Sequence, residues 1–228
     1  MTFVTRSVVS AVVSIGTHML VLCGAVLVAT ASLSAQNDAQ EKGLRAYQWI
    51  ETTELTWNGD AQPPSQQLCR YGPDGRIQKT PIGPARETLS DSGTRDMHEY
   101  LRDAEALIGA YELPDAREIE HAYRARTVSL NPTGTVVNLV FKDYVRPGDQ
   151  MTLAFDTSAR KIVSVNIDTP GGSDQDAVTF RAQMAGLPDG TTYVRQTVLT
   201  AGGTRLTVTR TNARFRILGL ATPEERSN

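Results

Sequence analysis

The period of the hydrophobic pattern changes along the chain, and this change predicts most of the secondary structure. From Thr127 onward apolar and polar residues alternate, as in Val137, Asn138 and Leu139. A period of two is typical of strands with one buried face, and such strands belong to antiparallel sheets. Short turns rich in Gly, Pro and Asp connect about six runs of this kind. The sequence therefore predicts a meander, in which strands that are neighbours in sequence pair with one another.

Aromatic and β-branched residues also predict strands in the first part of the chain. Residues 47–57 form one predicted strand, which the turn at 58–60 and the two prolines at 63–64 are expected to end. Residues 65–71 and 76–80 are predicted to form a hairpin around a Gly-Pro-Asp-Gly sequence. Proline followed by Asp-Gly presets the backbone of a tight turn, so these two strands are expected to pair.

Two segments between these groups of strands have a helical period instead. The first segment is predicted to begin with Thr94 as its N-cap, and a shorter helix is predicted over 115–124, entered through Pro114. A short lead-in helix is predicted within 36–45. The longer helix places its apolar residues at steps of three and four on one stripe: Met97, Tyr100, Leu101, Ala104, Leu107, Ile108 and Tyr111.

These elements together predict an α+β fold. We expect a large curved antiparallel β-sheet, in the form of an open half-barrel built as a meander, with two or three helices packed on one face. The helix stripes need burial, and the apolar face of the sheet is the available partner. Residues 36–220 are predicted to form a single β-rich domain, a common size with room for a core, and residues 221–228 a flexible tail.

The first 35 residues differ from the rest of the chain. No charged residue lies between Arg6 and Asp38, and the apolar run 19–31 is followed by small residues at 32–35. One positive charge, an apolar centre and a small-residue exit are the pattern of a secretory signal peptide. We therefore predict that residues 1–35 are a signal peptide and that the protein is periplasmic or secreted.

Two other interpretations of this segment stay open. The weakly apolar stretch 8–29 is about long enough for an uncleaved membrane anchor, although several polar residues dilute it. Lipidation at Cys23 is the third interpretation, and the residues before it lack the small side chain expected beside such a cysteine. A membrane contact is expected only if the N-terminal segment remains uncleaved.

Charge excludes one class of partner. Residues 1–35 contain one of the 23 basic residues and none of the 25 acidic residues, which leaves the remaining chain with a net charge of −3. A mildly acidic surface of mixed sign provides no electrostatic reason to bind nucleic acid. We expect no nucleic-acid partner.

The sequence contains no recognisable catalytic, metal-binding or cofactor-binding pattern, so we predict a non-enzymatic protein without cofactor or metal. His98 and His121 lie on predicted helices without the further ligands that a zinc site requires. The acids at strand ends are interpreted as structural, and Asp156 in particular as the cap of a turn: Asp143, Asp156 and Asp168. Cys69 has no cysteine partner once Cys23 is removed, and we interpret it as a half-buried strand residue.

The apolar face of the predicted sheet is the remaining candidate for a site. Its side chains either line a hydrophobic cavity or form an ordinary core filled by the helix stripe, and both interpretations stay open. The residues of this candidate ligand-binding face are Val137, Leu139, Phe141, Leu153, Phe155, Val165, Phe180 and Met184.

Three stretches carry a resemblance to known proteins: YGPDGRIQKTPIG at 71–83, LNPTGTVVNLVFKDYVRPGD at 130–149 and LPDGTTYVRQTVL at 187–199. They resemble a family of uncharacterised exported bacterial proteins, which implies export and no particular activity. The order of elements is also similar in outline to the periplasmic lipoprotein carriers, whose open half-barrel holds acyl chains. That second resemblance implies a fold, and a shared fold does not by itself imply a shared function.

Two functional hypotheses follow. In the first, an exported binding protein holds a lipid or another hydrophobic small molecule between sheet and helices. In the second, the core is filled and the protein is an envelope scaffold that binds a protein partner through the polar face of its last strands. The residues of that polar face are Thr179, Arg181, Gln183, Arg195 and Gln196.

Overall fold

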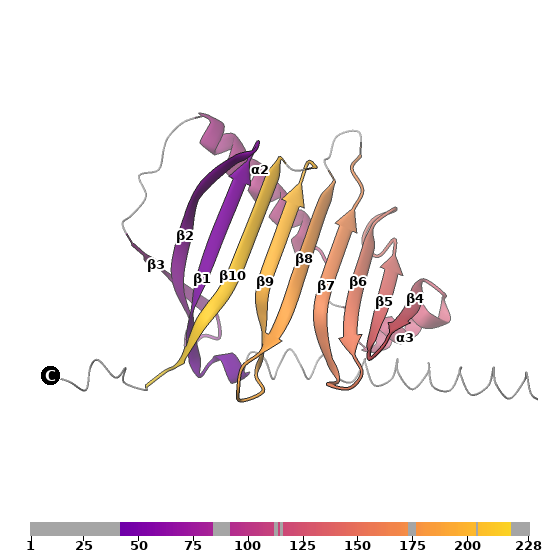
Figure 1. The fold of residues 1–228 in the computed structure, drawn as a ribbon. Coiled ribbons are helices and arrows are strands. Elements are labelled where there is room, and N and C mark those ends of the chain that lie inside the picture. Colours follow the sequence, from indigo (N-terminus) through magenta and orange to yellow (C-terminus); the bar gives the residue numbers. More distant parts are fainter. Residues whose placement is uncertain are drawn as a thin grey trace, which may run out of the picture.

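The computed structural model shows one antiparallel sheet of ten strands with helices on one face (Figure 1). It describes residues 42–83, 92–111, 114, 116–172, 177–203 and 205–219. The predicted signal peptide, most of the predicted lead-in helix and the predicted C-terminal tail lie outside the described residues. Residues 42–44 form a single helical turn before the first strand.

The strands follow one another across the sheet in the order β3-β2-β1-β10-β9-β8-β7-β6-β5-β4. Their bounds are β1 Tyr47–Trp57, β2 Asp60–Tyr71, β3 Ile77–Ile82, β4 Val128–Thr133, β5 Val136–Lys142, β6 Gln150–Asp156, β7 Lys161–Thr169, β8 Val178–Gly186, β9 Thr192–Ala201 and β10 Leu206–Ile217. The helices are α2, Ser92–Gly109, and α3, Ala116–Arg124.

The topology explains why helices cover one face of the sheet. The strands β3 and β4 are consecutive in sequence but form the two opposite edges of the sheet. The segment between them must therefore travel across the whole sheet, and α2, which at 18 residues is about 27 Å long, makes much of that crossing. Figure 1 shows α2 running diagonally behind the sheet and α3 beside β4.

The inner face, which α2 covers, is apolar along one continuous row. Successive strands from β4 to β1 contribute to this row Val128, Phe141, Met151, Ile167, Phe180, Leu199, Val208 and Leu55. The next row is apolar from β5 to β8 and then becomes polar, with Leu139, Leu153, Val165, Ala182, Thr197, Arg210 and Thr53. The inner face is therefore apolar toward β4 and partly polar toward β1.

Helix α2 packs on the sheet through the predicted stripe. Ala104 is buried against Leu199, Leu206 and Val208, and Leu107 and Ile108 contact residues of both halves of the core. Glu105 of α2 forms an ion pair with Arg210 at the point where the second row becomes polar. At the other end of the molecule Ile119 of α3 is fully buried in the core of the β4–β8 half.

Four details of the predicted elements were wrong. The meander from β4 to β10 contains seven strands, where about six were predicted. Helix α2 begins at Ser92, so Thr94 lies inside the helix and is not its N-cap. The prolines at 63–64 do not end a strand but lie within β2, and β3 continues beyond its predicted end at residue 80 to include Pro81.

The two prolines of β2 are tolerated because the ladder is interrupted there. Thr53 pairs with Ser65 and Leu55 pairs with Gln62, so the prolines at 63–64 lie in a bulge opposite a single residue of β1. They also lie beyond the reach of β3, which pairs with β2 only from Gln66 onward. A proline nitrogen without a hydrogen costs no ladder hydrogen bond at such a position.

Candidate functional site

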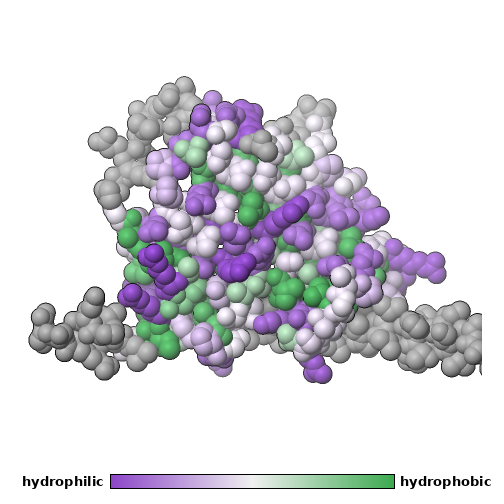
Figure 2. Space-filling model, viewed as in Figure 1, coloured by the Kyte–Doolittle hydropathy of each residue, from purple (hydrophilic) through white to green (hydrophobic). Residues whose placement is uncertain are grey.

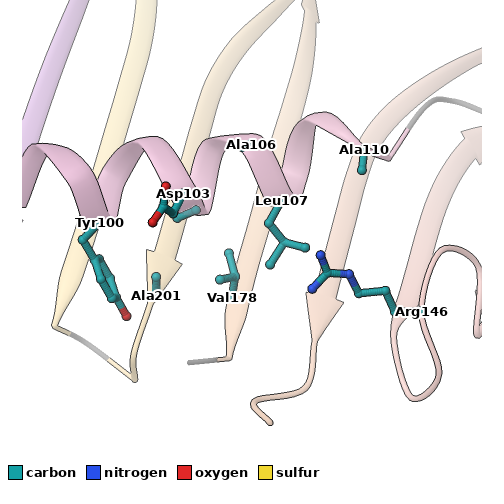
Figure 3. Close-up of a pocket in the computed structure, with 9 residues that line it drawn as sticks. Tyr100, Asp103, Ala106, Leu107, Ala110, Arg146, Val178 and Ala201 are labelled. Carbon is teal, nitrogen blue, oxygen red and sulfur yellow. The ribbon is translucent and has the colours of Figure 1, made fainter. Parts of the chain in front are cut away.

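A pocket of about 390 Å³ lies between α2 and the end of the sheet (Figure 3). Its walls come from three elements: one side of α2, the paired strand ends of β8 and β9, and the loop between β5 and β6. The lining residues are Tyr100, Asp103, Ala104, Ala106, Leu107, Ala110, Arg146, Val178 and Ala201. The volume falls within the range of about 300–1,000 Å³ that small-molecule sites occupy.

Small apolar side chains leave the space that forms this pocket. Val178 and Ala201 are register partners at the ends of β8 and β9 and are both buried. Leu107 of α2 lies above them (Figure 3), and Ala104 of the same helix also lines the pocket. Where longer side chains would fill the gap between helix and sheet, two alanines and a valine leave it open. The floor of the pocket is therefore apolar.

Polar groups surround this apolar floor. Tyr100 and Asp103 of α2 lie at one end of the pocket. Arg146 of the β5–β6 loop lies at the opposite end (Figure 3). The side chain of Asp103 is 70% exposed and lies 3.5 Å from the guanidinium of Arg102, so it belongs to the rim. The guanidinium of Arg146 points toward Leu107 and Val178 (Figure 3). An apolar floor with a few polar groups at its rim suits an amphiphilic molecule.

A buried carboxylate holds the β5–β6 loop in place. Asp149 is 2% exposed, and its carboxylate oxygens accept hydrogen bonds from the backbone N–H groups of Tyr144 at 2.6 Å, Val145 at 3.0 Å and Arg146 at 2.7 Å. The hydroxyl of Tyr111, just beyond α2, donates a fourth bond at 2.6 Å. This carboxylate therefore links the loop that carries Arg146 to the chain leaving the helix that forms the roof of the pocket.

The protonation of this pair follows from its surroundings. Burial disfavours the charged form of Asp149, but the hydrogen bonds from Tyr111 and from three backbone N–H groups outweigh burial, so the pKa of Asp149 lies below its ordinary value. Burial, together with the bond to the Asp149 carboxylate, raises the pKa of Tyr111. The carboxylate is ionised and the phenol is neutral at neutral pH, and the link between them is a charge-assisted hydrogen bond.

A stacked arrangement fixes the other end of the pocket. The guanidinium of Arg205, just before β10, lies 4.8 Å from the ring centroid of Trp57 and 5.1 Å from that of Tyr100. The two rings are themselves 5.3 Å apart. Cation–π contacts of this kind stabilise the docking of α2 on β1 and β10 and hold Tyr100 at the pocket wall.

The eight residues of the predicted ligand-binding face lie on the inner face as expected, but none of them lines this pocket. Five are buried in the core beneath α3 and the end of α2, while Phe180 and Met184 pack against that core and Val137 is half-buried. The buried five are Leu139, Phe141, Leu153, Phe155 and Val165. A ligand contact with these eight residues stays a prediction.

The structure also places the other residues that were considered for chemistry. His98 and His121 are both exposed on their helices. Asp156 accepts bonds from the N–H and hydroxyl groups of Ser158 and from the N–H of Ala159, so its predicted role as a turn cap is confirmed. It lies at the opposite end of the paired strands from Asp143, because Val136 pairs with Asp156 and Lys142 with Gln150.

Cys69 is fully buried rather than half-buried as predicted. Its register partner is Trp49, whose ring stacks on Phe215 at a centroid distance of 5.7 Å. Burial, followed by the nearby charge of Glu51, raises the pKa of the thiol, so the less nucleophilic protonated form is favoured. Within the described part of the chain, no group of three or more His, Cys, Asp or Glu residues is arranged to hold a metal ion.

The polar face named in the second hypothesis lies on the opposite side of the sheet from α2. Figure 2, viewed from that side, shows hydrophilic and near-neutral residues mixed with smaller hydrophobic groups. Arg181, Gln183 and Arg195 are exposed there, and the Arg195 guanidinium donates to the Gln183 side chain at 2.6 Å. None of the described helices is long and apolar enough to cross a membrane.

Comparisons with known proteins found only distant structural likenesses. No family model and no curated protein matches the chain. A DUF1329 family protein from Desulfovibrio piger is similar with 9% identity and a TM-score of 0.44, over 84% of this chain and 94% of that one. A putative outer membrane lipoprotein-sorting protein domain from Vibrio parahaemolyticus is similar with 11% identity and a TM-score of 0.36, over 87% and 95%. Both TM-scores lie below 0.5, and we draw no conclusion about fold or function from likenesses this distant.

Proposed function

We propose that this protein is an exported, non-enzymatic binding protein that holds a lipid or another hydrophobic small molecule between α2 and the sheet. The observation that carries the proposal is the pocket of about 390 Å³, with its floor of alanine, valine and leucine side chains. An apolar molecule with a polar end would place its apolar part on this floor and its polar end at the rim. Transfer of the apolar part from water supplies about 25 cal/mol for each Å² buried.

The position of the pocket supports this proposal further. It lies where α2 ends and the β5–β6 loop begins to cover the sheet, so a ligand can enter without separating the helix from the main core. Ala106 of α2 and Ala110 just beyond its end are exposed at the pocket, while Ala104 and Ala201 are buried within it. The site thus combines an accessible mouth with an apolar interior, as ligand sites between packed layers commonly do.

A blocked mouth tests the proposal. Substitution Ala106→Trp places a large ring at the mouth from an exposed helical position, where it disturbs no core contact. We expect wild-type protein to enhance the fluorescence of an environment-sensitive apolar probe, and Ala106→Trp to weaken probe binding at least tenfold. Both proteins are expected to unfold at similar temperatures.

The matched control is Glu99→Trp, which adds the same ring to an exposed position of α2 that does not line the pocket. This variant is expected to bind the probe like wild type. Equal binding by all three proteins would mean that the probe occupies another surface, and no binding by wild type would remove the proposal in favour of the scaffold hypothesis.

A further inference from the structure

The two walls of the pocket give it the same length. On the helix side the lining runs from Tyr100 to Ala110, a separation of ten positions, which corresponds to about 15 Å at 1.5 Å per residue. On the sheet side it runs from Ala201 at the end of β9 past Val178 of β8 to Arg146 in the β5–β6 loop (Figure 3). Strands β9 and β6 are three places apart in the sheet, or about 14 Å at a spacing of about 4.8 Å. The pocket is therefore elongated and crosses the strand ends beneath α2.

The width of the pocket follows from its volume and length. A volume of about 390 Å³ over a length of about 15 Å corresponds to a mean cross-section of about 26 Å². An extended hydrocarbon chain advances about 1.25 Å per carbon, because C–C bonds of about 1.52 Å meet at about 111°. A methylene group needs about the room of a water molecule in the liquid, about 30 Å³, so the chain has a cross-section of about 24 Å². The pocket therefore matches one extended chain and is too narrow for two chains side by side.

Large side chains lie at both ends of the pocket and limit its length. Tyr100 lies at one end, where its ring is 5.3 Å from the ring of Trp57 and 5.1 Å from the guanidinium of Arg205. Arg146 lies at the other end, in the loop whose backbone N–H groups bind the buried carboxylate of Asp149. Because contacts within the fold hold both end groups in place, the fold itself sets the length of the pocket.

Resting on the proposed function, we infer that the pocket selects ligands with a single unbranched chain of about twelve carbons. An extended chain of that size is about 15 Å long, and the volume has room for about thirteen methylene groups. Length and volume agree only for one chain that lies along α2 on the floor of Val178 and Ala201. A second chain, or carbons beyond that length, stays in water.

Uncharged monoacylglycerols with chains of 8 to 16 carbons test the inference without any substitution. Their dissociation constants are measured by displacement of the apolar fluorescent probe, below the concentrations at which they aggregate. Up to about twelve carbons we expect each added methylene to tighten binding about fourfold, and beyond that length we expect the affinity to level off. Dioctanoylglycerol is expected to bind within about twofold of monooctanoylglycerol, because its second chain stays in water.

Substitution Ala110→Leu shortens the pocket from its Arg146 end, at an exposed position. The new side chain adds three carbon atoms to the space, so the affinity is expected to level off about three carbons earlier, at about nine. The matched control is Gly109→Leu. Position 109 is exposed and does not line the pocket, and a β-carbon added there meets no other segment within 4 Å. This variant is expected to keep the wild-type limit, and both variants are expected to unfold at the wild-type temperature.

Several results would overturn the inference and leave the proposed function standing. One is an affinity that keeps rising to sixteen carbons, and another is a dioctanoyl ester that binds far more tightly than the monooctanoyl ester. A limit that Ala110→Leu leaves unchanged, or that Gly109→Leu shifts equally, would have the same meaning, as would esters that fail to displace a bound probe. Failure of the probe and of every ester to bind would overturn both.

Discussion

At the scale of single residues, Asp149 is the side chain on which the site depends most. It is a buried carboxylate with four hydrogen-bond donors, and among the described residues no buried side-chain nitrogen or oxygen lacks a partner. Replacing one partner of a buried polar network costs more than the network itself contributes, because the remaining groups lose their bonds without regaining water. The loop that carries Arg146 is therefore most sensitive to substitution at Asp149.

We expect Asp149→Asn to lower the free energy of unfolding by about 3 kcal/mol, because the amide replaces a charged acceptor and points N–H groups at backbone donors. Tyr111→Phe removes a single bond to a charged group and is expected to cost about 1.5 kcal/mol. Urea unfolding followed by circular dichroism measures both values. A neutral result for Asp149→Asn would contradict the account of this loop.

The same carboxylate makes stability depend on pH. The pKa of Asp149 is lower in the folded than in the unfolded chain. Its contribution is therefore fully present above the unfolded value of about 3.9 and is lost as the pH falls through the folded value. We expect the free energy of unfolding of wild type to fall between pH 5 and the acid limit by more than that of Asp149→Asn. Parallel curves for the two proteins would show that this carboxylate is not the group that titrates.

At the scale of elements, the two edge strands carry prolines where their backbones face away from the sheet. In β4 the nitrogen of Pro132 lies on the free edge. The N–H of Lys142 donates to the carbonyl of Thr127, and because hydrogen-bonded pairs alternate along β4 and β5, the backbone N–H direction at position 132 is away from β5. The N–H of Gly72 donates to the carbonyl of Arg76, and the same alternation puts the nitrogen of Pro81 on the free edge of β3. Each proline thus removes a donor that another strand would use, which protects an open sheet from edge-to-edge pairing.

We expect Pro81→Thr and Pro132→Thr together to restore both donors and to increase self-association at high protein concentration, with a change of less than about 1 kcal/mol in the stability of the monomer. Sedimentation velocity over a range of concentrations measures the association. Pro188→Thr, in the exposed turn between β8 and β9, is the control and is expected to behave like wild type. Unchanged sedimentation of the double variant would assign the protection of the edges to another feature.

The elements also show how much of the fold could be predicted from the sequence. Alternation correctly predicted the buried side of the meander, since Leu139, Phe141, Leu153 and Phe155 are all buried. Local patterns could not reveal that the chain from β3 to β4 must cross the sheet, because this depends on β1 pairing with β10 at the far end of the chain. The bulge that accommodates the prolines of β2 depends likewise on the register with β1.

The candidate site was harder to predict than the fold. Its lining residues come from α2, two strand ends and a loop, and no sequence pattern shows which small residues will face one another. Arg146 lies in an Arg-Pro-Gly-Asp turn that the sequence marks only as a turn. The available signal was the group of alanines at 104, 106 and 110, in α2 and just beyond its end, which leaves little bulk to fill the space above a sheet.

At the scale of the whole molecule, the two halves of the inner face of the sheet differ in polarity. Toward β4 both inner rows are apolar and α3 covers them, whereas toward β1 the second row becomes polar and contacts Glu105 of α2 through Arg210. The pocket opens beside the apolar half, at the row of sheet residues nearest the loops. A hydrophobic ligand is therefore expected at the end of the half-barrel rather than along its centre.

Export of the molecule is a separate proposal with its own measurement. We propose that residues 1–35 are removed, and we expect the intact mass of protein purified from the cell envelope to equal that of a chain beginning at Gln36 or Ala35. A mass that includes residues 1–35 would favour the uncleaved anchor, and an added diacylglyceryl mass on a chain beginning at Cys23 would favour lipidation.

The most direct test of ligand binding is native mass spectrometry of protein purified from the envelope, before and after extraction with organic solvent. We predict a discrete mass excess on the wild-type protein that extraction removes and that Ala106→Trp lacks while Glu99→Trp retains it. A bare polypeptide mass for wild type before extraction would contradict the account and direct attention to the polar face around Arg181 and Arg195.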